Sequence, residues 1–454
     1  MSVTPGHLKA VGARQEEPQR PLRKEACRSS QQSRPRLPKQ PQELPPHSTR
    51  GAESIPCRVT PSKGEPQPRR PPSPSHLLAQ ASAAGGTAGA PIGLTLANLG
   101  DVMPRPRPGH RQSPGCPHQL ANLSEPPGSL LGTFLGEGPG HGDARGAEPG
   151  LAVEELEYYS DDSHQGWVPL RLVKQAGLPS SPPSRHPVAI LLHATGGSKD
   201  EVATQQALFA GRGYLVAAID CRYHGARHDP AYANPRDGYE AALVRAWRQG
   251  PERPFLLDNV WDLLRLLDLL ETRPDADMAR VGMTGISLGG MHTWLCAAAD
   301  TRVAVAAPMI GVQYFMWAIE NTSWHGRVAS IPLVFEAARH DLGQPDVGEE
   351  VVEAVWHKLL PGLLDSYDAP KSLPLIAPRP LLIIKGETDP RCPLQGVEVA
   401  LVPTRATYAA LGAADKVQLF VEAGVGHECT ATMWAHASSW LDTHLLGQAG
   451  GEGT

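Results

Sequence analysis

The sequence predicts an α/β fold in which helices cover both faces of a mostly parallel, doubly wound sheet. Short continuous apolar runs, such as residues 188–192, alternate with segments of helical periodicity over about 300 residues. Runs of this kind are typical of strands that are buried on both faces of a parallel sheet. In doubly wound sheets, ligands bind at the carboxyl ends of the strands. We therefore expect the functional residues to follow directly after the strands.

Residues 1–150 do not have the composition of a folded domain. They contain 25 of the 46 prolines and a single aromatic residue, Phe134, so they can bury little apolar surface against the entropy cost of ordering. Lys and Arg outnumber Asp and Glu by 18 to 11 in this part, whereas the remainder of the chain carries 24 basic and 36 acidic side chains. We expect a disordered, proline-rich basic tail, a folded domain at 151–446 and a flexible C-terminus at 447–454.

The basic tail allows more than one interpretation. Such a tail can contact nucleic acid, a membrane surface or an import receptor, and a solvated extension without a specific partner explains it equally well. No apolar segment near Met1 resembles a secretory signal, and acidic residues interrupt the stretch where a transit peptide has few. The seven cysteines show no CxxC or metal-ligand spacing, which is typical of a reducing compartment. We expect a cytoplasmic protein without a nucleic-acid partner, with a plastid or another organelle as the alternative location.

Strands and helices alternate along the predicted domain. The first two strands are expected to form a hairpin, and the strongest helical periodicity lies at 256–270, where Asp258, Asp262 and Arg265 are expected to point away from the leucine face. Strands are expected at 151–159, 167–174, 188–192, 214–219, 280–284, 303–309, 380–384 and 417–421. Helices are expected at 200–210, 256–270, between 287 and about 299, and at 396–411 and 430–446. Two long uncharged runs, 281–299 and 303–319, contain glycine and are interpreted as buried strand and helix, so no membrane span is expected.

Two segments lack this alternation. Residues 178–184 are expected to be a linker because they are rich in proline and serine. Residues 312–375 are rich in aromatic residues and contain no clear strand pattern, so we expect a helical insertion that caps the site and forms the substrate pocket. Tyr314 and Trp317 are candidate substrate-binding residues, and a place in the hydrophobic core would explain both of them equally well.

Gly285, Ser287 and Gly289 form a Gly-x-Ser-x-Gly pattern between an apolar run and a segment that can be helical. This arrangement is typical of a nucleophile elbow, a sharp turn from strand to helix that exposes a serine hydroxyl. Side chains at the flanking glycines would collide where strand and helix cross, and positive φ angles are accessible to glycine. The pattern therefore predicts that Ser287 is a nucleophile.

Other strands end in residues that can activate a serine. Asp389 and His427 follow the seventh and eighth predicted strands, so Ser, Asp and His occur in that order along the chain. An imidazole can remove the serine proton during attack, and a carboxylate can hold the imidazole in the required tautomer. We favour Asp389 over Glu387 as the acid because Asp389 lies in the loop beyond the strand end. His193 is expected to order its own loop rather than act as a base.

The reaction that these residues support also needs donors for a negatively charged oxygen. The backbone N–H of Leu288, the residue after the nucleophile, is one expected donor. The loop after the third strand supplies the other, for which we expect the N–H of Thr195.

Four motifs carry a resemblance to a known family. They begin at His193 (HATGG), Asp220 (DCRYHG), Gly285 (GISLGG) and Gly386 (GETDPRCP). Together they resemble the dienelactone hydrolase and prolyl-oligopeptidase-like branch of the α/β-hydrolases over about residues 151–446. The resemblance implies an α/β-hydrolase fold with Ser287 as nucleophile, Asp389 as acid and His427 as base. Ala194 departs from the glycine that is usual at its position, and a serine nucleophile speaks against the dienelactone substrate.

The sequence predicts a serine hydrolase that cleaves carboxylic esters through an acyl-enzyme without a cofactor or a metal. A serine peptidase acting on short peptides would use the same residues, and a non-catalytic binding protein that kept the fold is a further alternative. The expected partner is a small-molecule ester or a short peptide. The acyl group and the oligomeric state stay open.

Overall fold

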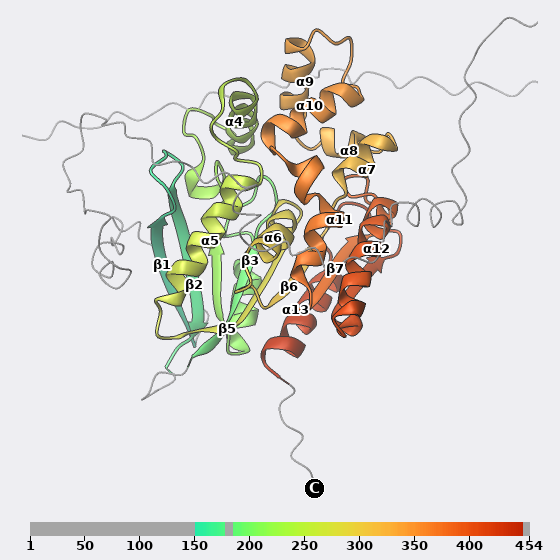
Figure 1. Cartoon of the computed structure of the whole chain (residues 1–454). Helices are drawn as coiled ribbons and strands as arrows, with labels where there is room; N and C mark the ends of the chain where they lie inside the picture. Colours follow the sequence, from blue (N-terminus) through green and yellow to red (C-terminus); the bar gives the residue numbers. More distant parts are fainter. Residues whose placement is uncertain (1–149, 178–184, 448–454) are drawn as a thin grey trace, which may run out of the picture. The chain divides into compact units, whose positions relative to one another are not determined.

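A computed structural model describes residues 150–177 and 185–447 of the chain (Figure 1). All but the last residue of the predicted basic tail, the predicted linker at 178–184 and all but the first residue of the predicted flexible C-terminus lie outside the described residues.

The described residues contain an eight-stranded sheet with the strand order β1-β2-β4-β3-β5-β6-β7-β8. The hairpin β1–β2 is antiparallel, β2 pairs with β4 in antiparallel orientation, and all the remaining pairs are parallel. The strands are β1 (Leu151–Tyr159), β2 (Trp167–Gln175), β3 (His186–Leu192), β4 (Leu215–Ile219), β5 (Ala276–Ile286), β6 (Val305–Met309), β7 (Leu381–Gly386) and β8 (Val417–Glu422). The predicted mostly parallel sheet and each of its predicted strands are confirmed.

Helices cover both faces of this sheet. The longer helices are α3 (Ala203–Gly211), α4 (Pro235–Gln249), α5 (Leu257–Glu271), α6 (Leu288–Ala299), α9 (Pro332–Asp341), α10 (Glu349–Leu359), α12 (Leu394–Ala410) and α13 (Ala431–Leu445). Shorter helical segments are η2 (Gly225–Arg227), α7 (Phe315–Glu320), α8 (His325–Val328), η3 (Leu363–Tyr367), α11 (Ala369–Ser372), η4 (Leu373–Ile376) and η5 (Ala414–Lys416). Because successive side chains of a strand point to opposite faces, Ile190 packs with α5 and α6, whereas Ala189 and Leu191 pack with α3 and α13.

The segment between β6 and β7 is helical, as predicted for 312–375. It contains α7, α8, α9, α10 and α11, and Trp356 of α10 anchors it by packing against Phe255, Phe315 and Phe335. The segment also contacts α4, because Arg248 Nε lies 2.8 Å from Asp341 Oδ2 of α9. Figure 1 shows α4, α9 and α10 beyond the carboxyl ends of the parallel strands, where the functional residues were expected. None of the described helices is long and apolar enough to cross a membrane.

The helix α4 was not predicted. Gly238 and several charged residues interrupt its apolar pattern, so periodicity alone does not reveal it. A local signal was present, since Asn234 accepts a hydrogen bond from the Arg236 N–H and Pro235 occupies the first turn.

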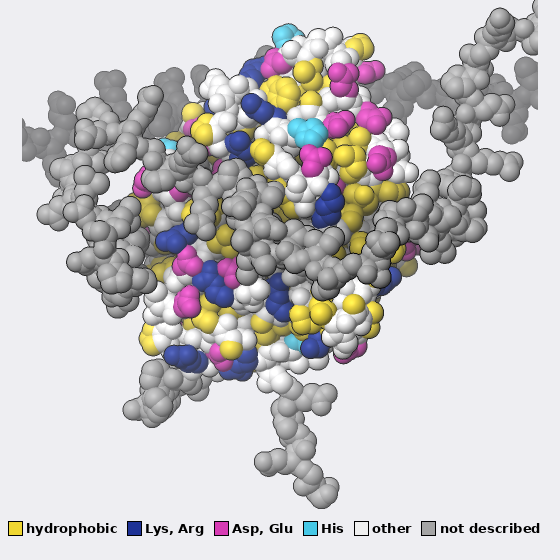
Figure 2. Space-filling view, viewed as in Figure 1, with side chains coloured by type: hydrophobic (Ala, Val, Ile, Leu, Met, Phe, Trp, Pro, Cys, Tyr) yellow, Lys and Arg dark blue, Asp and Glu magenta, His cyan; other side chains and the backbone are white. Residues whose placement is uncertain are grey.

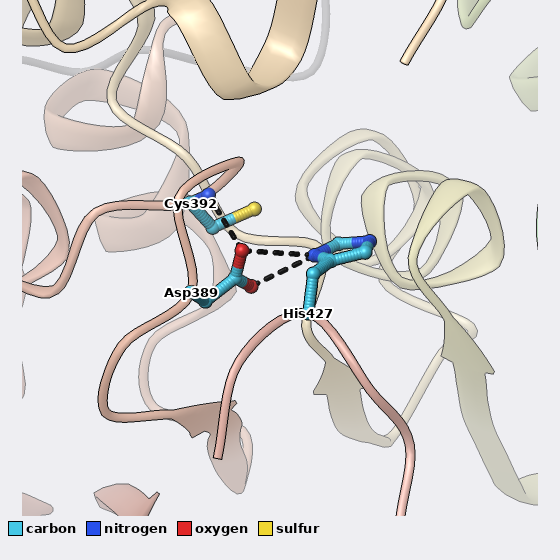
Figure 3. Close-up of side chains that lie close together, drawn as sticks. All are labelled: Asp389, Cys392 and His427. Carbon is cyan, nitrogen blue, oxygen red and sulfur yellow. Dashed lines mark hydrogen bonds and ion pairs between the residues drawn. The ribbon is translucent and has the colours of Figure 1, made fainter. Parts of the chain in front are cut away.

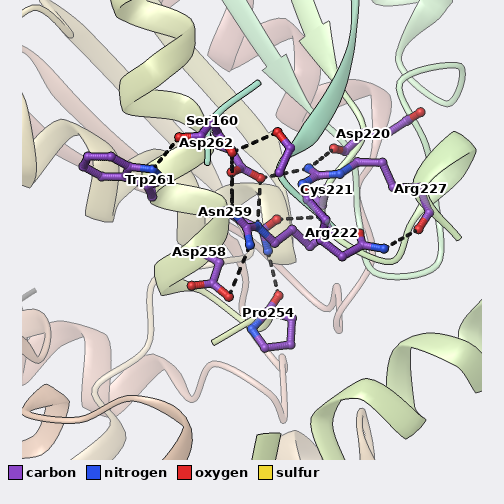
Figure 4. A network of polar contacts seen from close by, with 12 residues as sticks. Ser160, Asp220, Cys221, Arg222, Arg227, Pro254, Asp258, Asn259, Trp261 and Asp262 are labelled. Atoms are coloured by element: carbon purple, nitrogen blue, oxygen red, sulfur yellow. Dashed lines mark hydrogen bonds and ion pairs between the residues drawn. The ribbon is translucent and has the colours of Figure 1, made fainter. Parts of the chain in front are cut away.

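The prediction that Asp262 points away from the core was wrong. Asp262 is fully buried and lies in a polar network with the loop that follows β4 (Figure 4). Its carboxylate accepts hydrogen bonds from Arg222 Nη2 and Arg227 Nη1, both at 2.8 Å, and from Ser160 Oγ at 2.5 Å. Two guanidinium groups therefore compensate the buried charge of Asp262. Helical periodicity could not indicate these partners, because they lie outside the helix.

We expect the substitution Asp262→Ala to lower the free energy of unfolding by about 3–5 kcal/mol, because it leaves two buried guanidinium groups without their shared carboxylate. The matched control is Asp268→Ala on the same helix, whose partly exposed ion pairs should contribute less than about 1 kcal/mol. Urea denaturation followed by circular dichroism measures both values. Equal losses for the two variants would contradict a stabilising role for the buried network.

Candidate active site

The serine of the predicted elbow lies in a sharp turn between β5 and α6. Ser287 has a φ of 52°, a backbone conformation that residues with a side chain rarely adopt. A Cβ atom at Gly289 would lie 2.5 Å from the backbone oxygen of Leu192, and one at Gly285 would lie 2.7 Å from Gly289. The two glycines therefore allow α6 to cross β3 and β5 closely enough to hold Ser287 at the strand end.

Two loops bring a histidine and a carboxylate to this serine. Ser287 Oγ lies 2.7 Å from His427 Nε2, and His427 Nδ1 lies 2.9 Å from both carboxylate oxygens of Asp389. Asp389 follows β7 and His427 follows β8, so three separate strands supply the three side chains. Glu387 instead accepts a hydrogen bond from the Gly424 N–H and orders the histidine loop. The structure thus brings together the three residues that the sequence singled out.

The surroundings of the pair favour a charged Asp389 and a neutral His427. Burial acts to raise the pKa of Asp389, but its hydrogen bond to His427 and the backbone N–H groups of Arg391 and Cys392 outweigh burial and lower it. Burial lowers the pKa of His427, and the nearby Arg327 and Arg391 lower it further, against the opposing effect of Asp389. A neutral imidazole whose Nδ1–H is held by a carboxylate can accept a proton from Ser287 at Nε2.

Two backbone N–H groups near Ser287 are available to a ligand. Within residues 150–177 and 185–447, neither the Leu288 N–H nor the Thr195 N–H donates a hydrogen bond to the protein. The neighbouring Ala194 N–H is already engaged with Glu201 Oε2 at 3.2 Å. Ala194 is not among the residues with positive φ, so the backbone tolerates its side chain, whereas Gly196 has a φ of 84°.

His193 holds the loop that contains Thr195. Its Nε2 accepts a hydrogen bond from the Cys221 N–H at 3.0 Å, so its Nδ1 carries the proton that is donated to the Ala194 carbonyl at 2.8 Å. The His193 carbonyl in turn accepts a hydrogen bond from the Gly289 N–H at 3.1 Å. The side chain and the backbone of His193 thus connect the loops after β3 and β4 to the elbow, in agreement with the expected ordering role.

The sequence is similar to known hydrolases. The family model for acetyl xylan esterase (AXE1) matches residues 158–316, a stretch that includes Thr195 and Ser287 but ends before Asp389 and His427. YtaP of Bacillus subtilis (strain 168), which is named as a candidate hydrolase, is 27% identical over 188 residues, or 41% of this chain and 53% of that protein. The chain thus spans about half the length of this relative.

The strand order of the sheet, the elbow at Ser287 and this family match all indicate the same fold. The chain has the α/β-hydrolase fold. Similar solved structures include acetyl xylan esterase 1 from Thermoanaerobacterium sp. JW/SL YS485, which has a TM-score of 0.47 and 16% identity over 66% of this chain and 86% of that chain. The acetyl xylan esterase from Paenibacillus sp. R4 has a TM-score of 0.45 and 18% identity over the same shares of the two chains. The resemblance to α/β-hydrolases that was predicted from the motifs is confirmed.

A cysteine, Cys392, lies beside Asp389 and His427 (Figure 3). Asp389, Cys392 and His427 place possible ligand atoms within 4.8 Å of one another. Burial raises the pKa of the Cys392 thiol to about 12, so it stays protonated and donates to the Ile310 carbonyl at 3.5 Å. Both oxygens of Asp389 already face His427 Nδ1, and we therefore interpret the group as an acid and base pair beside a packed thiol rather than as a metal site.

The two predicted substrate-binding residues are placed differently from each other. Trp317 packs on α12, because a Cβ atom at Gly396 would lie 2.8 Å from its ring, whereas Tyr314 is half-buried at the start of α7. Among the described residues, neither side chain is hydrogen-bonded to Ser287, Asp389 or His427. A cavity of about 460 Å³ lies beside the loop that follows β7. Its lining includes Asp389, Ser323, His325, Glu387 and Leu394. Binding roles for Tyr314 and Trp317 stay predictions.

We expect His193→Ala to slow the phosphonylation of Ser287 by a fluorophosphonate about tenfold to hundredfold. The substitution leaves the Cys221 N–H and the Ala194 carbonyl without partners and displaces the Thr195 N–H from the developing charge. The matched control is His186→Ala. His186 is the first residue of β3, so its hydrogen bond to the Gly213 carbonyl lies at the end of the strand away from the elbow. Labelling rates under pseudo-first-order conditions measure both variants, and equal rates for His193→Ala and the wild type would contradict the positioning role.

Proposed function

We propose that this α/β-hydrolase is a serine hydrolase that cleaves carboxylic esters through an acyl-enzyme. The observation that carries the proposal is the continuous hydrogen-bonded series from Ser287 Oγ through His427 to Asp389, next to two backbone N–H groups that lack protein partners. The match to the acetyl xylan esterase family supports an ester as the substrate.

Acylation follows from the positions of these groups. His427 Nε2 removes the proton of Ser287 while Oγ attacks the carbonyl carbon of the ester. The negative charge that develops on the carbonyl oxygen is stabilised by the N–H groups of Leu288 and Thr195. His427 then donates its proton to the alcohol oxygen, the C–O bond breaks, and the alcohol leaves with the acyl group bound to Ser287.

Deacylation repeats the same steps with water as the nucleophile. His427 removes a proton from water, the resulting oxygen attacks the acyl carbon, and the proton returns to Ser287 Oγ as the acid is released. Asp389 keeps the proton of His427 on Nδ1 and stabilises the imidazolium that forms in both halves of the reaction. Side chains, backbone groups and water suffice for every step, so the proposal includes no cofactor.

The insertion at 312–375 is the segment that we propose to shape the pocket, with Tyr314 and Trp317 as contributors. The proposed substrate is a small-molecule ester, and we propose the cytoplasm as the location, a choice supported by four unpaired cysteines among the described residues. A short peptide would react with the same groups, and the test below separates the two substrate classes.

The test compares Ser287→Ala with Ser439→Ala, which removes an exposed hydroxyl on α13. We expect Ser287→Ala to lower the kcat for p-nitrophenyl acetate and butyrate by about four orders of magnitude or more, because no other group can form the acyl-enzyme. The Ser439→Ala variant should keep the wild-type rate. Turnover of aminoacyl anilides without turnover of the esters would favour a peptidase, and the absence of any Ser287-dependent turnover would contradict the proposal.

A further inference from the structure

A buried arginine of the helical insertion lies against the loop that carries the acid. Arg327 belongs to α8 and its exposed fraction is 2%. The preceding Gly326 packs directly on this loop, because a Cβ atom there would lie 2.3 Å from the Pro390 carbonyl oxygen. Arg327 Nη2 lies 3.4 Å from Cys392 Sγ, and the Cys392 N–H donates to Asp389 at 3.2 Å. A single residue therefore separates the guanidinium group from the acid of the proposed triad.

The positive charge of Arg327 has no counter-ion among the described residues. No carboxylate oxygen lies within 4.0 Å of it, and its two hydrogen-bond partners, Gln313 Oε1 at 2.8 Å and Cys392 Sγ, are neutral. The other two deeply buried arginines of the described residues, Arg222 and Arg227, each pair with Asp262 at 2.8 Å. Burial of a guanidinium group without an anion is costly. Ligand sites contain a small number of charged groups that fix the orientation of the ligand, and an anionic ligand would compensate this charge.

The guanidinium group of Arg327 still has donors to offer. Its Nε and Nη2 atoms make the two hydrogen bonds, whereas Nη1 makes none within the described part of the chain. Nη1 is also not among the fully enclosed nitrogen and oxygen atoms that lack a partner, so it retains contact with solvent. A planar fork of this kind matches the geometry of a carboxylate.

A second arginine faces the same region. Arg391 follows Asp389 by two residues and is half-buried, and the structure shows no hydrogen bond or ion pair of its side chain within residues 185–447. A Cβ atom at Gly326 would lie 3.0 Å from the backbone nitrogen of Arg391, so the two arginines come from backbone segments that touch. Burial lowers the pKa of Arg391, and the charge of Arg327 lowers it further. The folded part of the chain is not basic in general. Figure 2 shows acidic side chains gathered over α9 and α10, and residues 151–454 carry 24 basic and 36 acidic side chains.

We propose that Arg327, assisted by Arg391, binds a carboxylate that the substrate carries close to the scissile ester, so that the substrates are acidic esters. This inference rests on the proposed ester hydrolysis and adds the substrate class to it. Arg327 lies in the segment that follows β6, and Arg391 lies in the loop that follows β7. In this proposal the two arginines position and select the substrate, while Ser287, His427 and Asp389 carry out the bond changes.

The test uses two pairs of esters that differ only in a carboxylate and its neutral amide. Monomethyl succinate and methyl succinamate place the group on the acyl side, whereas 4-acetoxybenzoate and 4-acetoxybenzamide place it on the alcohol side. We expect the wild type to have a higher kcat/KM for the carboxylate member of at least one pair. In Arg327→Gln, the kcat/KM of the carboxylate member divided by that of its amide should fall by about tenfold or more, because a charge-assisted hydrogen bond is lost.

Two further variants separate recognition from a structural role. Arg327→Lys keeps the charge and should retain part of the preference, whereas Arg405→Gln removes an exposed charge from α12 and should leave the ratio unchanged. If Arg327→Gln does not fold, Arg391→Gln should still lower the ratio, and succinate should inhibit the wild type competitively and more strongly than succinamide. A purely structural Arg327 would lower kcat/KM equally for both members of a pair.

The outcomes distinguish this inference from the proposed function. Turnover of the neutral esters without any preference for the carboxylates, or a ratio that Arg327→Gln leaves unchanged, would overturn the acidic-ester inference alone. Absence of turnover for all four esters, with p-nitrophenyl acetate and butyrate still cleaved, would also overturn this inference alone. Absence of turnover for the p-nitrophenyl esters as well would overturn the ester hydrolase proposal and this inference with it.

Discussion

The close crossing of β5, β3 and α6 at Ser287 is the constraint on which the rest of the site depends. The crossing requires glycine at 285 and 289, and it forces Ser287 into a positive φ that directs its hydroxyl beyond the strand end. The same crossing leaves the Leu288 N–H at the start of α6, where the first amides of a helix have no partner within the helix. The proposed nucleophile and one proposed donor for the oxyanion thus result from one backbone turn.

The loops around this turn are held by buried polar contacts rather than by apolar packing alone. His193 connects the loop after β3 to the loop after β4 and to Gly289, and the loop after β4 is anchored through Arg222 and Arg227 on Asp262. Buried networks whose charges are paired in this way favour one arrangement of the loops. Arg327 differs from these arginines because its charge is not paired, which is why we assign it to the substrate rather than to the scaffold.

The sequence was sufficient to predict the sheet and the meeting of three residues at its carboxyl edge. Buried parallel strands are continuous apolar runs, and topology then places Ser287, Asp389 and His427 together whatever the details of the loops. Asp262 was misplaced because helical periodicity treats a charged residue as exposed, and its partners lie 35 and 40 residues away. Arg327 was missed for a related reason, since the lack of a counter-ion is a property of packing between distant segments and has no local signal.

The most direct measurement is a crystal structure of the protein after reaction with a fluorophosphonate, whose adduct mimics the tetrahedral intermediate. The account predicts phosphorus bonded to Ser287 Oγ and a phosphonyl oxygen at about 2.7–3.1 Å from the backbone nitrogens of both Leu288 and Thr195. An adduct on another residue, or an oxygen that faces away from these two N–H groups, would contradict it.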